Sequence, residues 1–205
     1  EGGLGRSLVA IEEVMDIFEC ASSWELSPRG ETLQGIFHEM DLLVALCIDG
    51  AIFDDVSSPE LAGLISVLTY EHRSRLEPPP PWFPNQTSKL KAQEIIGYSA
   101  KIRREENKRG LPESRTPDAT IFGQVHGWAS GHELSEVLDD DTSAGDFVRN
   151  IRQVIDLLGQ LADSTRSQSL KKNSIEAGRL LDRGLVSAAA RIQDTDEDSE
   201  SLDDH

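Results

Sequence analysis

The stretch that decides the fold spans residues 143–161 and reads SAGDFVRNIRQVIDLLGQL. At about 100° per residue, its side chains separate onto two faces of an α-helix. One face is an apolar stripe, made of Phe147, Ile151, Val154, Ile155, Leu158 and Leu161. The other face is a polar row, made of Arg149, Arg152, Gln153, Asp156 and Gln160. The pattern predicts an amphipathic helix over residues 143–163.

The start of this helix is also predicted by the sequence. Ser143 is a good N-cap, and Asp146, three residues later, completes a variant of the capping box. Periodicity alone leaves two interpretations of the polar row open. It is either the solvated face of an ordinary surface helix or a surface that contacts a ligand.

Outward from this helix, seven more segments have helical patterns. They are residues 8–20, 31–47, 58–73, 88–108, 118–130, 133–138 and 169–190. In the third of these, Ser58 is expected as the N-cap with Pro59 in the first helical position. The sequence therefore predicts an all-α fold, a multi-helix bundle of about seven to eight helices.

Two further segments suggest protein contacts. The run Pro78–Pro81 must break the helix before it, and we expect a stiff loop with Trp82 and Phe83 docked on the bundle. The alternative is a polyproline II stretch that recruits a proline-binding domain. Residues 193–205 hold seven acidic residues and no Lys or Arg, which is typical of a solvated tail. The alternative is that this tail mimics nucleic acid and competes with it for a basic channel.

The charge balance limits the function. With 37 acidic and 20 basic residues, the net charge is −17, which argues against a free-standing nucleic-acid binder. The cations cluster instead at Lys101, Arg103, Arg104, Lys108 and Arg109. Any contact with a polynucleotide must therefore be local.

Motifs for catalysis or metal binding are missing from the sequence. It contains no Gly-rich Lys-Ser/Thr phosphate loop, no Asp-Glu-x-His box and no His or Cys spacing suited to zinc. We expect no catalytic residue, no metal ligand and no cofactor in this chain. Cys20 and Cys47, among apolar neighbours, are expected to be buried free thiols. There is no apolar run of membrane-spanning length and no signal peptide or initiator Met, so we expect a cytoplasmic segment of a longer protein.

The central helix also carries a family resemblance. Residues 145–149 (GDFVR) followed by 153–158 (QVIDLL) resemble the most recognisable segment of the DSHCT domain, the C-terminal helical bundle of superkiller-type DExH-box RNA helicases, in its actinobacterial branch. Four more blocks are similar to the family and follow its order over roughly residues 26–190. They are EMDLLVALC (39–47), PELAGLISVLTYEHR (59–73), VHGWASG (125–131) and RGLV (183–186).

The resemblance implies a domain division and a role. Residues 1–30, which include the short strand Trp24-Glu25-Leu26 and the turn 27–30, would end a winged helix. Residues 31–192 would form the DSHCT bundle, and 193–205 the acidic tail. In such helicases two RecA-like domains bind ATP and Mg and form a ring with the winged helix and the bundle. The resemblance thus implies single-stranded RNA, or DNA, and the motor domains and winged helix of the same polypeptide as partners.

One bundle helix of that family, the ratchet helix, presents polar side chains to the strand leaving the motor, and residues 143–163 are similar to it. Arg149 matches an RNA-facing arginine of the family. One turn later, where eukaryotic relatives tend to have a second arginine, this sequence has Gln153. Arg152 and Asp156 complete the candidate contacts on this helix.

A second candidate site is Glu71 and His72, at the end of the predicted helix 58–73; the competing interpretation is a solvated helix terminus. The alternative function is a helical protein-interaction scaffold that acts through the Pro-rich loop or the acidic tail, with no nucleic-acid role.

Overall fold

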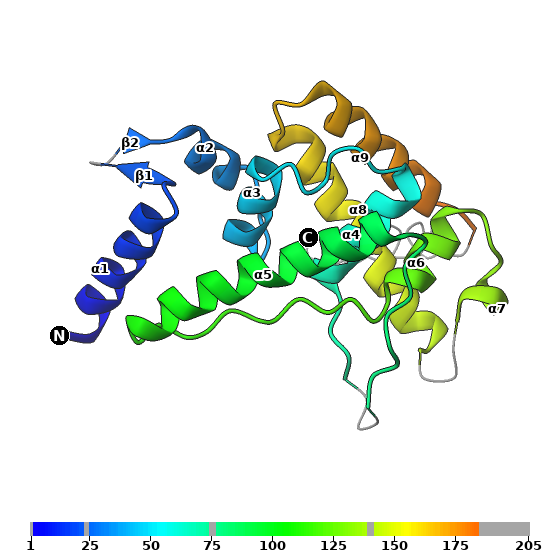
Figure 1. Ribbon diagram of the computed structural model, residues 1–205, viewed down its shortest axis with the longest axis horizontal. Coiled ribbons are helices and arrows are strands. Elements are labelled where there is room, and N and C mark those ends of the chain that lie inside the picture. Colours follow the sequence, from blue (N-terminus) through cyan, green and yellow to red (C-terminus); the bar gives the residue numbers. More distant parts are fainter. Residues whose placement is uncertain (1, 23–24, 74–76, 139–141, 185–205) are drawn as a thin grey trace, which may run out of the picture.

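A computed structural model of the chain describes residues 2–22, 25–73, 77–138 and 142–184. Within these ranges it has nine helices and one two-stranded antiparallel sheet, so the predicted all-α class is confirmed (Figure 1). None of the described helices is long and apolar enough to cross a membrane. The acidic tail, the acidic turn 139–141 and Trp24 lie outside the described residues.

The elements follow one another in a single order along the chain. They are α1 (Gly2–Ile17), β1 (Ala21–Ser22), β2 (Glu25–Leu26), α2 (Pro28–Gln34), α3 (Asp41–Asp49), α4 (Ser58–Thr69), α5 (Gln86–Lys108), α6 (Phe122–Ala129), α7 (Leu134–Val137), α8 (Ala144–Ser164) and α9 (Gln168–Leu181).

Helix α4 is the centre of the core. All its residues from 61 to 68 are buried, and it packs against α6, α8 and α9. Gly63 allows the close approach of α6, because a Cβ atom there would lie 2.7 Å from Cζ of Phe122. Helices α8 and α9 run side by side along one flank of this core (Figure 1).

Ser57 caps α4, and Glu60 completes a capping box with it. The Glu60 carboxylate accepts hydrogen bonds from Ser57 Oγ at 2.6 Å, Asn85 Nδ2 at 2.6 Å and Ser88 Oγ at 2.7 Å. Partial burial alone would raise the pKa of Glu60, but these hydrogen bonds outweigh it and lower the pKa to about 2. One carboxylate thus joins the N-termini of α4 and α5.

Helix α5 connects the two ends of the molecule. It packs against α4 at one end and against α3 and α1 further along, so α1 and the β1–β2 hairpin lie far from α8 and α9 (Figure 1). The prediction of a strand near Glu25–Leu26 is confirmed, but its partner β1 was not predicted. The assignment of residues 1–30 to a winged helix stays a prediction.

The single helix predicted over 31–47 is wrong: two helices, α2 and α3, occupy this region. Gly35 caps the C-terminus of α2, and the backbone N–H of Met40 then donates to Nδ1 of His38 at 3.1 Å. The apolar spacing continues across this turn, because Ile36 and Met40 are both buried. That continuity hides the break in the sequence.

The end predicted for the third helix is also wrong. Helix α4 begins one residue earlier than expected, with Ser57 rather than Ser58 as N-cap, and Tyr70 is already extended. The guanidinium of Arg115 donates to the carbonyls of Leu68 at 2.5 Å and Tyr70 at 2.6 Å. Since these carbonyls are satisfied from outside the helix, the chain leaves it at Thr69 instead of Arg73.

Helices α6 and α9 are shorter than predicted, at 122–129 and 168–181. Asp118 does not start a helix, because its carboxylate accepts the backbone N–H groups of Thr120 and His72. In the Pro-rich loop, Phe83 is half-buried with its ring centroid 4.9 Å from that of Phe122, so its docking is confirmed. Trp82 rests on α6, 5.6 Å from the His126 ring, but stays 57% exposed. Both cysteines are buried and free, as predicted.

Candidate nucleic-acid interface

The division of α8 into two faces is confirmed. The predicted apolar stripe is buried, apart from Ile155, which is half-buried against the core. Ser143 is the N-cap: Asp146 N–H donates to Ser143 Oγ at 3.1 Å, and Ser143 Oγ donates to Asp146 Oδ2 at 2.7 Å. The helix is therefore stabilised both by its N-cap and by the burial of its apolar face.

The polar row opens to solvent over the first three turns of α8. The Arg149 side chain is 74% exposed, and its Nη1 donates to Asp146 Oδ1 at 3.0 Å. Gln153 and Asp156 are exposed, whereas Arg152 is half-buried. An i,i+3 pair at this exposure is weak, about 0.2–0.5 kcal/mol, so the guanidinium is available to a stronger anion.

Asn150 is a polar residue of α8 that the sequence analysis did not single out. It is 5% exposed, and its Nδ2 donates to Oγ1 of Thr69 at 3.1 Å. A buried amide needs such a partner, so this contact fixes the first half of α8 against the end of α4. An asparagine on the apolar side of the helical wheel is the signal that could have identified it.

The far end of the polar row is tied to another part of the chain. Gln160 Nε2 donates to Asp156 Oδ2 at 2.8 Å, and Gln160 Oε1 accepts the backbone N–H of Phe37 at 2.7 Å. Asp156 therefore orients Gln160, and Gln160 holds the turn between α2 and α3. Contact between nucleic acid and Asp156 or Arg152 is an untested prediction.

Glu71 and His72 do not end a helix, since α4 stops at Thr69, but His72 lies near the start of α8. The backbone N–H of His72 donates to Asp118 Oδ2 at 2.8 Å, and Glu71 pairs with Arg73 at 3.3 Å. His72 and Thr142, just before α8, line the same small recess. His72 is therefore close to the residues that precede α8, and the Asn150–Thr69 contact holds the end of α4, two residues before Glu71, against the same helix.

The cationic cluster of α5 is largely paired within the chain. Arg103 pairs with Glu113, Lys108 with Glu105 at 2.7 Å, and Arg109 with Glu105 at 2.8 Å. Hydrogen bonds from Lys108 and Arg109 lower the pKa of Glu105. Because most of its charge is matched locally, this cluster is a poor site for a phosphate backbone.

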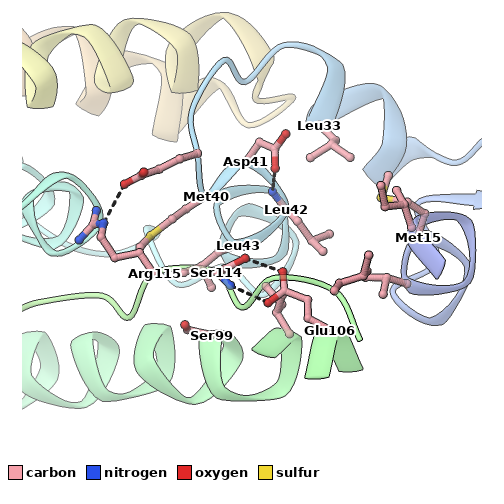
Figure 2. Close-up of a pocket in the computed structure, with 15 residues that line it drawn as sticks. Met15, Leu33, Met40, Asp41, Leu42, Leu43, Ser99, Glu106, Ser114 and Arg115 are labelled. Carbon is pink, nitrogen blue, oxygen red and sulfur yellow. Dashed lines mark hydrogen bonds and ion pairs between the residues drawn. The ribbon is translucent and has the colours of Figure 1, made fainter. Parts of the chain in front are cut away.

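A separate cavity of about 260 Å³ lies between α1, α2, α3 and α5 (Figure 2). Its wall is mostly hydrocarbon, and its polar groups are engaged. Glu106 accepts the backbone N–H of Ser114 at 2.8 Å and its hydroxyl at 2.5 Å, and Arg115 pairs with Glu39 at 2.7 Å. This cavity does not adjoin the polar row of α8.

A packed all-α body in which one long helix turns a polar face to solvent defines a helical-bundle domain. The chain belongs to the DSHCT family, whose DSHCT (NUC185) domain matches residues 23–189.

Three similar proteins carry the names of helicases or probable helicases. The chain is 32% identical over 177 residues to the probable helicase HelY of Mycobacterium leprae, covering 81% of this chain and 19% of the relative. It is 30% identical over 172 residues to the probable helicase HelY of Mycobacterium tuberculosis, covering 78% and 19%. It is 26% identical over 173 residues to the chloroplastic DExH-box ATP-dependent RNA helicase DExH15 of Arabidopsis thaliana, covering 80% and 14%. The chain spans about a fifth of the mycobacterial relatives.

Proposed function

We propose that this chain is the C-terminal accessory domain of an ATP-dependent RNA helicase and guides single-stranded nucleic acid out of the motor along α8. The observation that carries the proposal is the solvent-exposed polar row: the Arg149 side chain is 74% exposed, while the apolar face on the opposite side of α8 packs against the core. The names of the relatives support the helicase context. ATP and Mg would bind the motor domains of the parent polypeptide.

The chemistry of the row fits a strand that moves. Arg149 pairs with a phosphate or stacks on a base plane, and Gln153 exchanges neutral hydrogen bonds with the same strand. Neither contact reads the base sequence strongly, which suits a translocating motor. Asp156 accepts hydrogen bonds only, from a 2′-hydroxyl or a base amino group, and Arg152 adds a second cation at its half-buried position. Glu71 and His72 flank the entry to this path.

The test is Arg149→Ala in the full polypeptide that carries this domain. Unwinding of a duplex with a single-stranded overhang should fall about tenfold, while ATP hydrolysis is largely retained, because the motor keeps its own contacts. The fold is unaffected, since the lost ion pair is exposed and weak.

Arg179→Ala is the matched control. Arg179 lies on α9, is 77% exposed and pairs with Glu176 at i−3, as Arg149 does with Asp146. This variant should unwind at the wild-type rate. Equal rates for the Arg149 variant, the Arg179 variant and the wild type would contradict the guide role.

A protein-interaction scaffold is the second candidate, and the exposed ring of Trp82 beside Pro79 and Pro80 favours it. Trp82→Ala leaves the docked Phe83 in place, so the bundle should keep its fold. Loss of a co-purifying protein from this variant, with unwinding intact, would support the scaffold role.

A further inference from the structure

Phe37 has the most exposed large apolar side chain in the described part of the molecule, at 82%. It lies in the turn between α2 and α3, whose backbone is firmly held: Ile36 and Met40 on either side are each only 3% exposed. A single exposed apolar side chain is common at a protein surface. What distinguishes Phe37 is its position.

The turn that carries Phe37 is bonded to the last residue of the α8 polar row. The backbone N–H of Phe37 donates to Gln160 Oε1 at 2.7 Å, and Gln160 Nε2 donates in turn to Asp156 Oδ2 at 2.8 Å. Two hydrogen bonds therefore hold the backbone of this turn against the C-terminal part of α8, and the Phe37 ring projects from the turn into solvent.

A recess adjoins the ring and contains suitable polar groups. It has a volume of about 450 Å³, and its wall includes Phe37, Gln160, Ser164 and Arg166 together with the acidic residues Glu31 and Asp163. The hydroxyl oxygen of Ser164 is buried and has no hydrogen-bond partner among the described residues. Arg166 is 67% exposed and pairs with Glu31. An aromatic face beside an amide and a guanidinium suits an unstacked nucleobase, and the carboxylates of the wall can accept hydrogen bonds from base amino groups.

We propose that this recess is a nucleotide subsite in which a base of the guided strand stacks on Phe37 and meets Gln160 and Arg166 at its edge. The inference rests on the proposed function, and it extends the strand path to the C-terminal end of α8. Gln160 lies eleven residues after Arg149, or about 16 Å along a helix that rises about 1.5 Å per residue. A stacked strand that advances about 3.4 Å per nucleotide covers this distance with about five nucleotides.

The test uses the full polypeptide and a single-stranded RNA that carries the fluorescent base 2-aminopurine at one position in turn. Stacking on Phe37 should quench the fluorescence at one register, about five nucleotides from the register that responds to Arg149→Ala. Phe37→Ala should abolish this quenching and weaken RNA affinity about fivefold or more. Phe37→Tyr should keep both signals, because it keeps the ring. Leu90→Ala, which truncates another exposed apolar residue, on α5, should match the wild type.

Each other outcome has a distinct meaning. If Phe37→Ala matches the wild type while Arg149→Ala weakens binding, the subsite is refuted and the guide function stands. If neither variant changes binding, both proposals fail. If Phe37→Leu binds and quenches like the wild type, the contact is only apolar and the stacking proposal is overturned. If Phe37→Ala leaves the RNA signals intact but separates the domain from the motor domains, Phe37 serves a protein contact instead.

Discussion

Replacing Gly63 with alanine probes the close contact between α4 and α6 in the core. A Cβ atom at this position would lie 2.7 Å from Cζ and 2.8 Å from Cε1 and Cε2 of Phe122. The Phe122 ring is fully buried and is flanked by the rings of Phe83, at 4.9 Å, and His126, at 6.3 Å. Because the ring has no free space to enter, α4 and α6 must move apart.

The magnitude follows from two opposing effects. Overpacking a filled core costs about 1–3 kcal/mol, and three contacts below 3.0 Å with an immobile ring place this site in the upper half of that range. Alanine regains roughly 1 kcal/mol over glycine through helix propensity. The net loss is about 1–2 kcal/mol, which lowers the melting temperature of a domain of this size by about 2–8 °C.

The assay is thermal unfolding followed by circular dichroism, with Gly97→Ala as the matched control. Gly97 is also helical, on α5, but a Cβ atom there would meet nothing within 4 Å. The same substitution should therefore raise the melting temperature by about 2–4 °C. If Gly63→Ala is as stable as Gly97→Ala, the α4–α6 spacing does not depend on this glycine and the packing argument is refuted.

Three more outcomes follow from other contacts. Hydrogen bonds lower the pKa of Glu60 from its usual value of 4.5 to about 2. They therefore stabilise the folded state at any pH above 4.5, and this stabilisation is lost as the pH falls from 4.5 through 2. Glu60→Gln should flatten the decline in melting temperature over that pH range. Cys20 and Cys47 are buried, and burial raises the pKa of both thiols, so an aromatic disulfide reagent should label neither before unfolding, and fast labelling of the native protein would contradict their placement. Arg109 bridges α5 to α1 through Glu13 at 2.9 Å, so Arg109→Ala should speed limited proteolysis within α1, whereas Arg104→Ala, an exposed position on the same helix, should not.

The parts of the fold that the sequence predicted are those with local causes. The cap at Ser143 and the repeat of apolar residues over 147–161 involve neighbours within one or two turns, so α8 lies where its pattern places it. The same holds for α5, which begins two residues before the predicted start and ends at Lys108 as expected. Local periodicity also predicts which face of α8 is buried.

The missed features depend on contacts between distant residues. The bond between Phe37 and Gln160 joins residues 123 positions apart, and Arg115 ends α4 from 45 and 47 positions away. No spacing rule within a window of helical length contains such pairs. Strand β1 is only Ala21–Ser22, two residues with weak strand preference, and it exists because β2 pairs with it.

The matched charges on α5 determine how the domain responds to ionic strength. Arg103, Lys108 and Arg109 already pair with carboxylates of their own chain. A strand that lay against these three side chains would therefore release few counterions. For a single strand, each phosphate neutralised contributes about −0.7 to the slope of log affinity against log salt. On the proposed path Arg149 and Arg152 would add at most two such increments, so we expect added salt to weaken strand binding only slightly.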